Sequence, residues 1–304
     1  MVPCRNLGVA LRTTVGGSTV IVTGASSGIG EATARMLGAA GAETVLVARS
    51  EGRLKTLKRE IEEAGGRACV HPADLSDVGA VDALVDGVHR CHGDVDVLVN
   101  NAGHSIRRSI DLSYDRFHDF ERTIRVNYLG PVRLVLGVLP RMRELGRGHL
   151  LNVSSLGVLF AAPRFSAYLA SKSAFESFLR CIAPEVRGEG VAVTNIYMPL
   201  VHTPMAEKTH VYRLMPGLTA EQAAVRICRA VVDRPRRVAP TLGLAGRLFA
   251  DAAPAPFDSL LGFTYRWSTD SSAARGESLD ALEAPAFAQP FLRRLEHHRG
   301  SVQG

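Results

Sequence analysis

Aromatic residues are scarce in this chain of 304 residues, at 6% of the total. Its 36 Lys and Arg against 30 Asp and Glu leave a mild net charge of +6. The densest basic clusters, at 141–147 and 234–237, alternate with apolar residues. They lack the interleaved aromatic side chains on which bases stack in nucleic-acid grooves. We therefore expect no nucleic-acid partner.

Cysteines are few, and no long apolar run is present. The five cysteines, Cys4, Cys69, Cys91, Cys181 and Cys228, are odd in number, far apart and without C-x-x-C spacing. This pattern is typical of isolated thiols in a reducing compartment, and it predicts neither disulfides nor a metal site. No run is long enough to span a bilayer, and the first residues lack the apolar core of a signal peptide. We expect a cytoplasmic protein, with peripheral membrane contact left open for its C-terminal part.

Short apolar runs alternate with amphipathic helical patterns along most of the chain. The runs lack the period-2 alternation of strands with one solvated face, so they predict parallel strands buried on both faces. The fold class that follows is α/β, a Rossmann-type doubly wound parallel sheet. One long helix is expected over 120–144. The apolar runs lie at 19–22, 44–48, 68–76, 95–103, 148–155 and 191–198.

The composition changes after about Val238, where the chain becomes rich in Ala, Gly, Leu and Pro. We expect a single domain over residues 16–235 and a helical extension over residues 236–304. The extension either packs on the core or on another subunit, covers a long apolar substrate, or contacts a membrane. Within the domain, Pro184 is expected to kink or end the helix in which it lies.

A glycine-rich turn joins the first apolar run to the helical pattern after it. In TVIVTGASSGIGEATARML, Gly24, Gly28 and Gly30 would let backbone N–H groups approach a pyrophosphate at a helix N-terminus. The spacing G-x-x-x-G-x-G is wider than the usual dinucleotide fingerprint. It nevertheless stands in the strand–turn–helix context that such a site needs, so we expect a bound dinucleotide.

The ends of the second and third runs bear on which dinucleotide is bound. An NAD site needs a carboxylate after the second strand, whereas this chain has Arg49 and Ser50 there. Arg49 can form charge-assisted hydrogen bonds to a ribose 2′-phosphate, so we expect NADP(H). An ordinary surface arginine is the alternative. Asp74 is placed to accept from the adenine amino group, to cap the next helix, or to do both.

Further motifs follow in a fixed order: NNAG at 100–103, Asn127 in VNYLG, Ser155 in NVSS and YLASK at 168–172. Together with TGASSGIG at 23–30, they resemble the short-chain dehydrogenase/reductase superfamily over roughly residues 16–235. The resemblance implies an oxidoreductase whose dinucleotide-binding and catalytic domain covers those residues.

The resemblance implies a catalytic group of Asn127, Ser155, Tyr168 and Lys172. Tyr168 would give its proton to the substrate oxygen as hydride arrives, and Ser155, rather than Ser154, would hydrogen-bond that oxygen. A phenol has an ordinary pKa of about 10, and the ammonium of Lys172 is expected to favour the phenolate. Lys172 would also hold the nicotinamide ribose. Asn127 would hold a water that links Lys172 to solvent, or is simply a polar residue on a helix.

The resemblance also implies which residues border the cofactor. Thr203 would contact the nicotinamide carboxamide. Leu200 stands where many relatives have Gly, and it is expected to reshape that loop without abolishing binding. The expected cofactor-binding residues are Gly24, Ser26, Ser27, Gly28, Ile29, Gly30, Arg49, Ser50, Asp74, Leu75, Asn101, Ala102, Gly103, Tyr168, Lys172, Pro199, Val201 and Thr203.

Several further stretches resemble a narrower group, the bacterial long-chain fatty acyl-CoA reductases. This resemblance implies NADPH-dependent reduction of an acyl thioester to an aldehyde. Arg107 and Arg108 would then either meet coenzyme A phosphates or face solvent. The stretches are SIRRSI at 105–110, YDRFHDFERT at 114–123, RFSAYLASK at 164–172 and IYMPLVHTPM at 196–205.

Two alternatives to an acyl-CoA reductase stay open. One is a general ketone/alcohol or β-keto lipid reductase, which would use the same catalytic group. The other is a non-catalytic NADP-binding protein, against which the intact Tyr168 and Lys172 argue. Relatives are often dimers or tetramers through the helices that include AYLASK, so we expect a homo-oligomer.

Overall fold

The structure of the chain is a computed structural model that describes residues 7–206, 212, 215–267, 270 and 274. Within these residues, seven parallel strands form one sheet in the order β3-β2-β1-β4-β5-β6-β7, which confirms the doubly wound α/β fold. The strands are β1 (Thr19–Thr23), β2 (Glu43–Ala48), β3 (Arg67–Pro72), β4 (Val97–Asn100), β5 (Gly148–Ser155), β6 (Val191–Met198) and β7 (Arg237–Val238).

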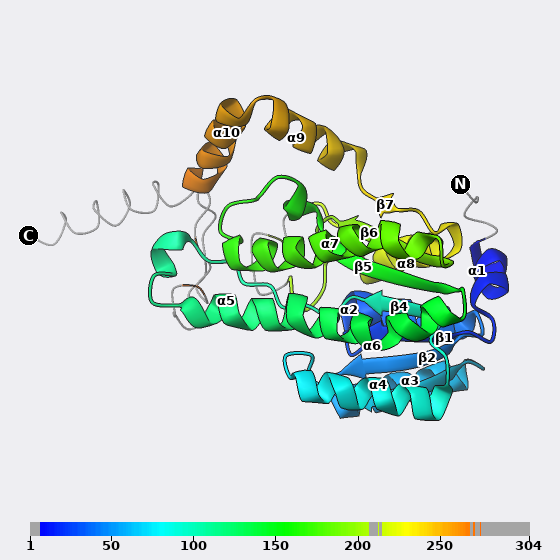
Figure 1. Cartoon of the computed structure of the whole chain (residues 1–304). Coiled ribbons are helices and arrows are strands. Elements are labelled where there is room, and N and C mark those ends of the chain that lie inside the picture. The colour runs from blue at the N-terminus through cyan, green and yellow to red at the C-terminus, as the bar shows by residue number, and fades with distance from the viewer. Residues whose placement is uncertain (1–6, 207–211, 213–214, 268–269, 271–273, 275–304) are drawn as a thin grey trace, which may run out of the picture.

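Helices cover both faces of the sheet (Figure 1). Separate apolar cores fill the two sides, one around Leu37 and Ile227 and the other around Leu134 and Phe175. The central strands β1 and β4 are buried along their length, as the lack of period-2 alternation predicted. One side carries α1 (Leu7–Val15), α2 (Gly28–Ala39), α3 (Glu51–Glu63) and α8 (Ala220–Asp233), and the other carries α4 (Val78–His92), α6 (Gly130–Glu144) and α7 (Ser166–Arg187).

The stretch expected to be one long helix is continuous but contains a change of pitch. α5 (Phe117–Ile124) passes through a π-helical turn, Arg125–Leu129, into α6. Such turns are rare and are frequent at functional sites. This one holds Asn127, which is 1% exposed. At its end Gly130 lies so near the chain after β3 that a Cβ there would stand 1.9 Å from the Leu75 oxygen.

Several element boundaries differ from the sequence-based expectation. α7 continues past Pro184 to Arg187, so that proline does not end the helix. β3 stops at Pro72, four residues before the expected end, since proline has no N–H for the ladder. The expected strand at 95–103 is shortened to β4, and α1 was not expected at all.

Among the described residues beyond β7 are two helices, α9 (Thr241–Ala252) and α10 (Pro254–Trp267), drawn in orange tones in Figure 1. α9 packs against a 3₁₀ turn, η4 (Leu156–Leu159), that directly follows β5. The contact is close, because a Cβ on Gly243 would stand 2.3 Å from Leu156 Cδ1. No described helix is long and apolar enough to cross a membrane.

Candidate active site

Gly24, Gly30 and Asn101, three of the expected cofactor residues, meet where the strand order reverses, between β1 and β4. Gly24 follows β1 with φ of +68°, and a Cβ there would stand 2.9 Å from Asn101 Nδ2. A Cβ on Gly30, in the first turn of α2, would stand 2.3 Å from the Gly24 oxygen. Both positions therefore require glycine. In open α/β sheets this reversal point is where ligands bind.

Thr23 joins the two strand ends and was missed by the sequence analysis. Its Oγ1 accepts from the backbone N–H groups of Asn101 and Ala102, each at 3.0 Å, and donates to the Val99 oxygen at 3.3 Å. Asn101 Nδ2 donates to the Thr23 oxygen at 2.9 Å. In a doubly wound sheet β1 and β4 are neighbours. A hydroxyl residue at the end of β1 could therefore have been identified from the sequence as a link to the end of β4.

The start of α2 is suited to an anion. The N-cap residue, Ser27, makes no side-chain hydrogen bond to the first turn. Free amides at a helix N-terminus favour phosphate groups. Gly28 has φ of +56°, and a Cβ there would stand 3.0 Å from Thr203 Cγ2. The structure thus brings Thr203 against the glycine turn, although the two lie far apart in sequence.

The candidates for adenosine recognition lie at the ends of β2 and β3. Arg49 and Ser50 are exposed, and Ser50 is the N-cap of α3. Asp74 Oδ1 accepts from the Ser76 amide at 2.9 Å and from Ser76 Oγ at 2.8 Å. Burial acts to raise the pKa of Asp74, but these hydrogen bonds and the charge of Arg49 outweigh it, so the pKa is lowered. Asp74 is ionised at neutral pH and lies within the field of Arg49.

Asp74 does not cap the next helix, so that interpretation is wrong. The N-cap of α4 is Asp77, whose Oδ1 accepts from the Gly79 amide at 2.9 Å and from the Ala80 amide at 3.4 Å. Leu75, between the two aspartates, is 6% exposed and packs in the core that α4 covers.

Ser155 and Tyr168 are brought together from β5 and α7. Ser155 is the last residue of β5, and its hydroxyl hydrogen-bonds the Tyr168 side chain. Ser155 Oγ also accepts from the Gly157 amide at 3.2 Å. The neighbouring Ser154 Oγ is buried and has no hydrogen-bond partner among the described residues. The geometry therefore favours Ser155 over Ser154 as the partner of Tyr168.

Lys172 lies one helical turn after Tyr168, and its Nζ donates to the Val153 oxygen of β5 at 3.0 Å. Desolvation lowers the pKa of Lys172 to about 8. Desolvation also raises the pKa of Tyr168 to about 12, against the hydrogen bond with Ser155 and in concert with the nearby Tyr212. The expectation that Lys172 brings the phenol pKa down is therefore not met in this structure.

Asn127 and Lys172 reach the same point on the chain after β4. A Cβ on Gly103 would stand 3.2 Å from Lys172 Nζ and 3.3 Å from Asn127 Oδ1. Asn127 Nδ2 donates to Ser171 Oγ at 2.9 Å. The π-helical turn thus directs the amide of Asn127 toward α7 and toward the segment that follows β4.

The remaining candidates lie beside this group. Val201, just after β6 and Pro199, pairs with Leu218 in an isolated bridge and is 7% exposed. Arg107 is half-buried and lowers the pKa of Tyr212, which burial otherwise raises. Arg108 does not face solvent, because its Nε lies 3.2 Å from Asp119 Oδ2 in a largely buried ion pair.

The fold and the site define a Rossmann-type oxidoreductase with a Ser–Tyr–Lys group beside a dinucleotide crevice. Residues 18–212 match the family model described as short chain dehydrogenase. A fatty acyl-CoA reductase of Acinetobacter baylyi is 45% identical over 289 residues, which cover 94% of this chain and 98% of that protein. A fatty acyl-CoA reductase of Mycobacterium tuberculosis is 43% identical over 246 residues, or 81% of this chain and 84% of that protein. The chain belongs to the short-chain dehydrogenase/reductase family.

Solved structures agree with this assignment. A metagenomic short-chain oxidoreductase in complex with NADP superposes with a TM-score of 0.64 at 32% identity, covering 75% of this chain and all of that one (100%). The L-sorbose reductase of Gluconobacter frateurii, complexed with NADPH and L-sorbose, superposes with a TM-score of 0.67 at 27% identity, covering 72% and 91%.

Proposed function

We propose that this chain is an NADP(H)-dependent reductase that converts a long-chain fatty acyl-CoA to the fatty aldehyde. The observation that carries the proposal is the 45% identity to a fatty acyl-CoA reductase over 94% of this chain. That match extends well past residue 212, where the general family match ends. It therefore includes part of the extension, which is a natural place for recognition of a particular substrate.

The crevice residues support the cofactor part of the proposal. The glycine turn and the start of α2 would hold the pyrophosphate, and Arg49 would pair with the 2′-phosphate. Asp74 would accept from the adenine amino group. The segment 101–103 and Lys172 would border the nicotinamide ribose. When bound, NADPH supplies the hydride.

Tyr168 is the proposed proton donor. A phenol with a pKa of about 12 is fully protonated at neutral pH, which suits donation to a carbonyl oxygen. As hydride reaches the thioester carbon, Tyr168 protonates the oxygen while Ser155 hydrogen-bonds it. The resulting hemithioacetal returns its hydroxyl proton to Tyr168 as the carbon–sulfur bond breaks. Aldehyde and coenzyme A leave, and the thiolate takes a proton from solvent.

The position of the extension supports the proposal that it covers the acyl chain. A cavity of about 330 Å³ lies between η4 and the α9–α10 pair, with Val158, Phe160, Phe257 and Leu261 among its lining residues. The charged side chains of Arg247, Asp251 and Asp258 also line it, so an acyl chain there would lie along its apolar side. Because η4 directly follows Ser155, an acyl chain in this cavity would begin close to the catalytic group.

A buried ion pair holds Asp270 beside the site. Arg164, four residues before Tyr168, lies 3.0 Å from Asp270, and the two side chains are 6% and 13% exposed. Arg164 also donates to the Tyr265 oxygen at 3.1 Å, and its guanidinium lies 4.2 Å from the centre of the Tyr265 ring. The contact supports a substrate cover fixed in place through the sequence RFSAYLASK.

Exposed apolar side chains support two further parts of the proposal. On α9 and α10, Leu248, Phe249, Leu260 and Phe263 are 46–70% exposed, which supports contact with a lipid surface.

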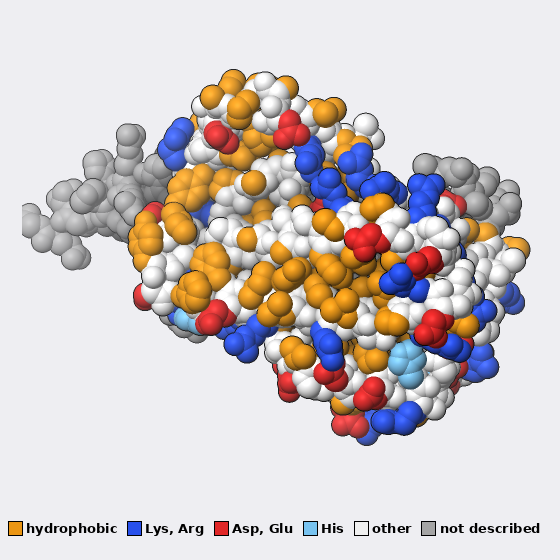
Figure 2. Space-filling view, viewed as in Figure 1, with side chains coloured by type: hydrophobic (Ala, Val, Ile, Leu, Met, Phe, Trp, Pro, Cys, Tyr) orange, Lys and Arg blue, Asp and Glu red, His pale blue; other side chains and the backbone are white. Residues whose placement is uncertain are grey.

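Apolar side chains also gather over α5, α6 and α7, on the face shown in Figure 2. This second patch supports a homo-oligomer in which these helices pack against those of another copy.

The test follows NADPH oxidation by the full-length protein with palmitoyl-CoA, palmitaldehyde and a panel of simple ketones. We expect turnover of palmitoyl-CoA, one thiol released per acyl-CoA consumed, and an aldehyde that a hydrazine reagent captures. Turnover of ketones without any turnover of acyl-CoA would overturn the thioester assignment in favour of a ketone reductase. The ratio of NADPH oxidised to thiol released shows whether the aldehyde is reduced further.

A further inference from the structure

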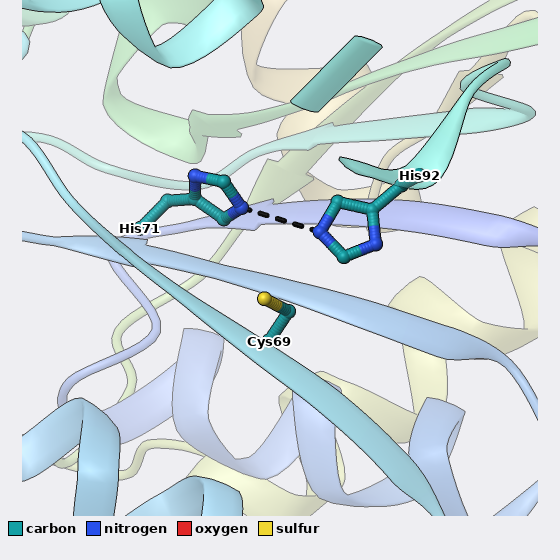
Figure 3. Close-up of side chains that lie close together, drawn as sticks. All are labelled: Cys69, His71 and His92. Carbon is teal, nitrogen blue, oxygen red and sulfur yellow. Dashed lines mark hydrogen bonds between the residues drawn. The ribbon is translucent and has the colours of Figure 1, made fainter. Parts of the chain in front are cut away.

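Three side chains of types that can bind a metal ion gather at the edge of the sheet, on the α4 side (Figure 3). Cys69 and His71 alternate along β3 on one face, opposite to Ala68 and Val70, which pack in the other core. His92 is the last residue of α4. The sulfur and the nearest ring nitrogens of the three residues all lie within 4.8 Å of one another.

The spacing of the two histidines fits a shared metal ion. His71 Nε2 and His92 Nε2 are 3.3 Å apart. Two imidazole nitrogens bound at about 2.0–2.1 Å to a tetrahedral zinc ion stand roughly 3.3–3.4 Å apart, so the observed pair needs no rearrangement. A hydrogen bond between the two rings would give the same distance. The thiol of Cys69 beside the pair favours a metal ion, because a hydrogen-bonded histidine pair does not need a third ligand. Two histidines and a thiolate form a ligand set that zinc commonly uses.

Glu43 orients His92 in the manner of an outer ligand. Glu43 Oε1, at the start of β2, lies 2.7 Å from His92 Nδ1, and the His92 side chain is 6% exposed. The carboxylate accepts the Nδ1 proton, which leaves the lone pair of Nε2 directed toward His71. A carboxylate on the far nitrogen of a histidine ligand fixes its tautomer and increases its basicity.

The ring of His71 reaches α4. It lies against α4 where Gly87 has no side chain, since a Cβ there would stand 3.6 Å from His71 Nδ1.

We propose that Cys69, His71 and His92 bind one zinc ion, with Glu43 as a positioning residue and a solvent molecule as the fourth ligand. Binding displaces the thiol proton of Cys69 to solvent. The ion would tie β3, an edge strand, to the end of α4. Cys69 pairs with Val45 in the interior of β2, away from the strand ends that form the crevice, so the site stabilises the sheet and takes no part in hydride transfer.

This proposal departs from the sequence-based expectation of no metal site. The expectation rested on cysteine spacing alone, and only one of the proposed ligands is a cysteine. C-x-H on a strand with a second histidine twenty-one residues later is not a recognised zinc pattern. The fold brings the residues together because α4 returns antiparallel to β3.

The test uses full-length protein without a histidine tag, stripped with a chelator and dialysed. Zinc titration calorimetry is expected to show one equivalent bound, with a higher thermal midpoint of unfolding. Cobalt(II), used as a spectroscopic probe, is expected to give tetrahedral d–d bands and a thiolate-to-cobalt charge-transfer band. Cys69→Ser should remove the charge-transfer band. His92→Gln and His71→Gln should each weaken zinc binding at least tenfold, and Glu43→Gln about ten- to a hundredfold.

Matched controls lie on the same helix. Cys91→Ser, an exposed cysteine next to His92, and His89→Gln should leave zinc affinity and the cobalt spectrum unchanged. Circular dichroism and NADPH binding establish that each variant is folded. The proposal would be overturned if the folded wild-type protein failed to bind zinc, or if Cys69→Ser and His92→Gln bound zinc as tightly as the wild type. Either result would mean that His71 and His92 form only a hydrogen-bonded pair. Neither result bears on the proposed reductase activity.

Discussion

Asn127 and the backbone of His104 are joined by two reciprocal hydrogen bonds. The His104 amide donates to Asn127 Oδ1 at 2.8 Å, and Asn127 Nδ2 donates to the His104 oxygen at 2.9 Å. An amide side chain satisfies both backbone groups at once, which a carboxylate cannot do because it has no donor. The pair fixes the segment that follows β4, on which Asn101, Ala102 and Gly103 stand. Asn127 is thus a positioning residue for the cofactor side of the site.

Replacing Asn127 by Asp should keep one of the two hydrogen bonds with His104 and remove the other. The carboxylate still accepts from the His104 amide but cannot donate to the His104 oxygen or to Ser171. A buried acceptor left without its partner costs about 1–3 kcal/mol. We expect the free energy of unfolding in urea to fall by about that amount and KM for NADPH to rise. If both values were unchanged, the hydrogen bonds between Asn127 and His104 would have no role in stability or in NADPH binding.

Tyr168→Phe removes the proposed proton donor and little else. Loss of a general acid typically costs about a hundred- to ten-thousand-fold in rate, and we expect kcat to fall within that range. NADPH affinity, measured by fluorescence titration, should change little because the ring remains. Tyr114→Phe, at a tyrosine that is 79% exposed, is the matched control and should behave as wild type. A near-normal kcat in Tyr168→Phe would refute the assigned mechanism.

Lys172 should impose an alkaline limb on the pH profile. Its pKa is lowered to about 8 by burial, so raising the pH through 8 removes its charge in the free enzyme. The neutral amine binds the cofactor less well, so kcat/KM for NADPH should decrease above pH 8. The residual activity of Lys172→Arg should lack that limb, because a guanidinium stays charged throughout. A flat wild-type profile between pH 7 and 9.5, roughly one to two units around the pKa, would contradict the assignment.

The close approach of α2 to β1 predicts a contrast between two glycines. Gly30→Ala would place a methyl group 2.3 Å from the Gly24 oxygen and should weaken NADPH binding or prevent stable folding. Gly52→Ala, in the first turn of α3, meets nothing within 4 Å and should stabilise the protein by about 0.4–1 kcal/mol. Thermal unfolding with and without NADPH measures the stability and the cofactor binding of each variant. If Gly30→Ala were as stable as Gly52→Ala and bound NADPH as well, the close approach of α2 to β1 would be refuted.

Much of this architecture was predictable because local patterns and the fold agree. The strands at 148–155 and 191–198 coincide with β5 and β6, since their apolar runs end where turn residues begin. Less local features were not predictable. The π-helical turn ends at Gly130, which contacts the chain after β3, and the His71–His92 contact joins β3 to the end of α4. Thr23 was overlooked because its partners lie in β4 and directly after it, seventy-six or more residues later.

Arg49 provides the sharpest test of cofactor choice. It is exposed at the end of β2, and its charge already acts on Asp74 across the strand ends. Arg49→Asp replaces the proposed partner of the 2′-phosphate by a repelling carboxylate that can instead accept from a ribose hydroxyl. Hydrogen bonds to charged groups are worth about 1.5–3 kcal/mol, so the preference for NADPH over NADH should fall roughly ten- to a hundredfold. Arg53→Asp, at an exposed arginine one turn into α3, controls for the change in overall charge. The ratio of kcat/KM for the two cofactors is the measurement, and an equal shift in both variants would mean that long-range charge, and not contact with the 2′-phosphate, sets the preference.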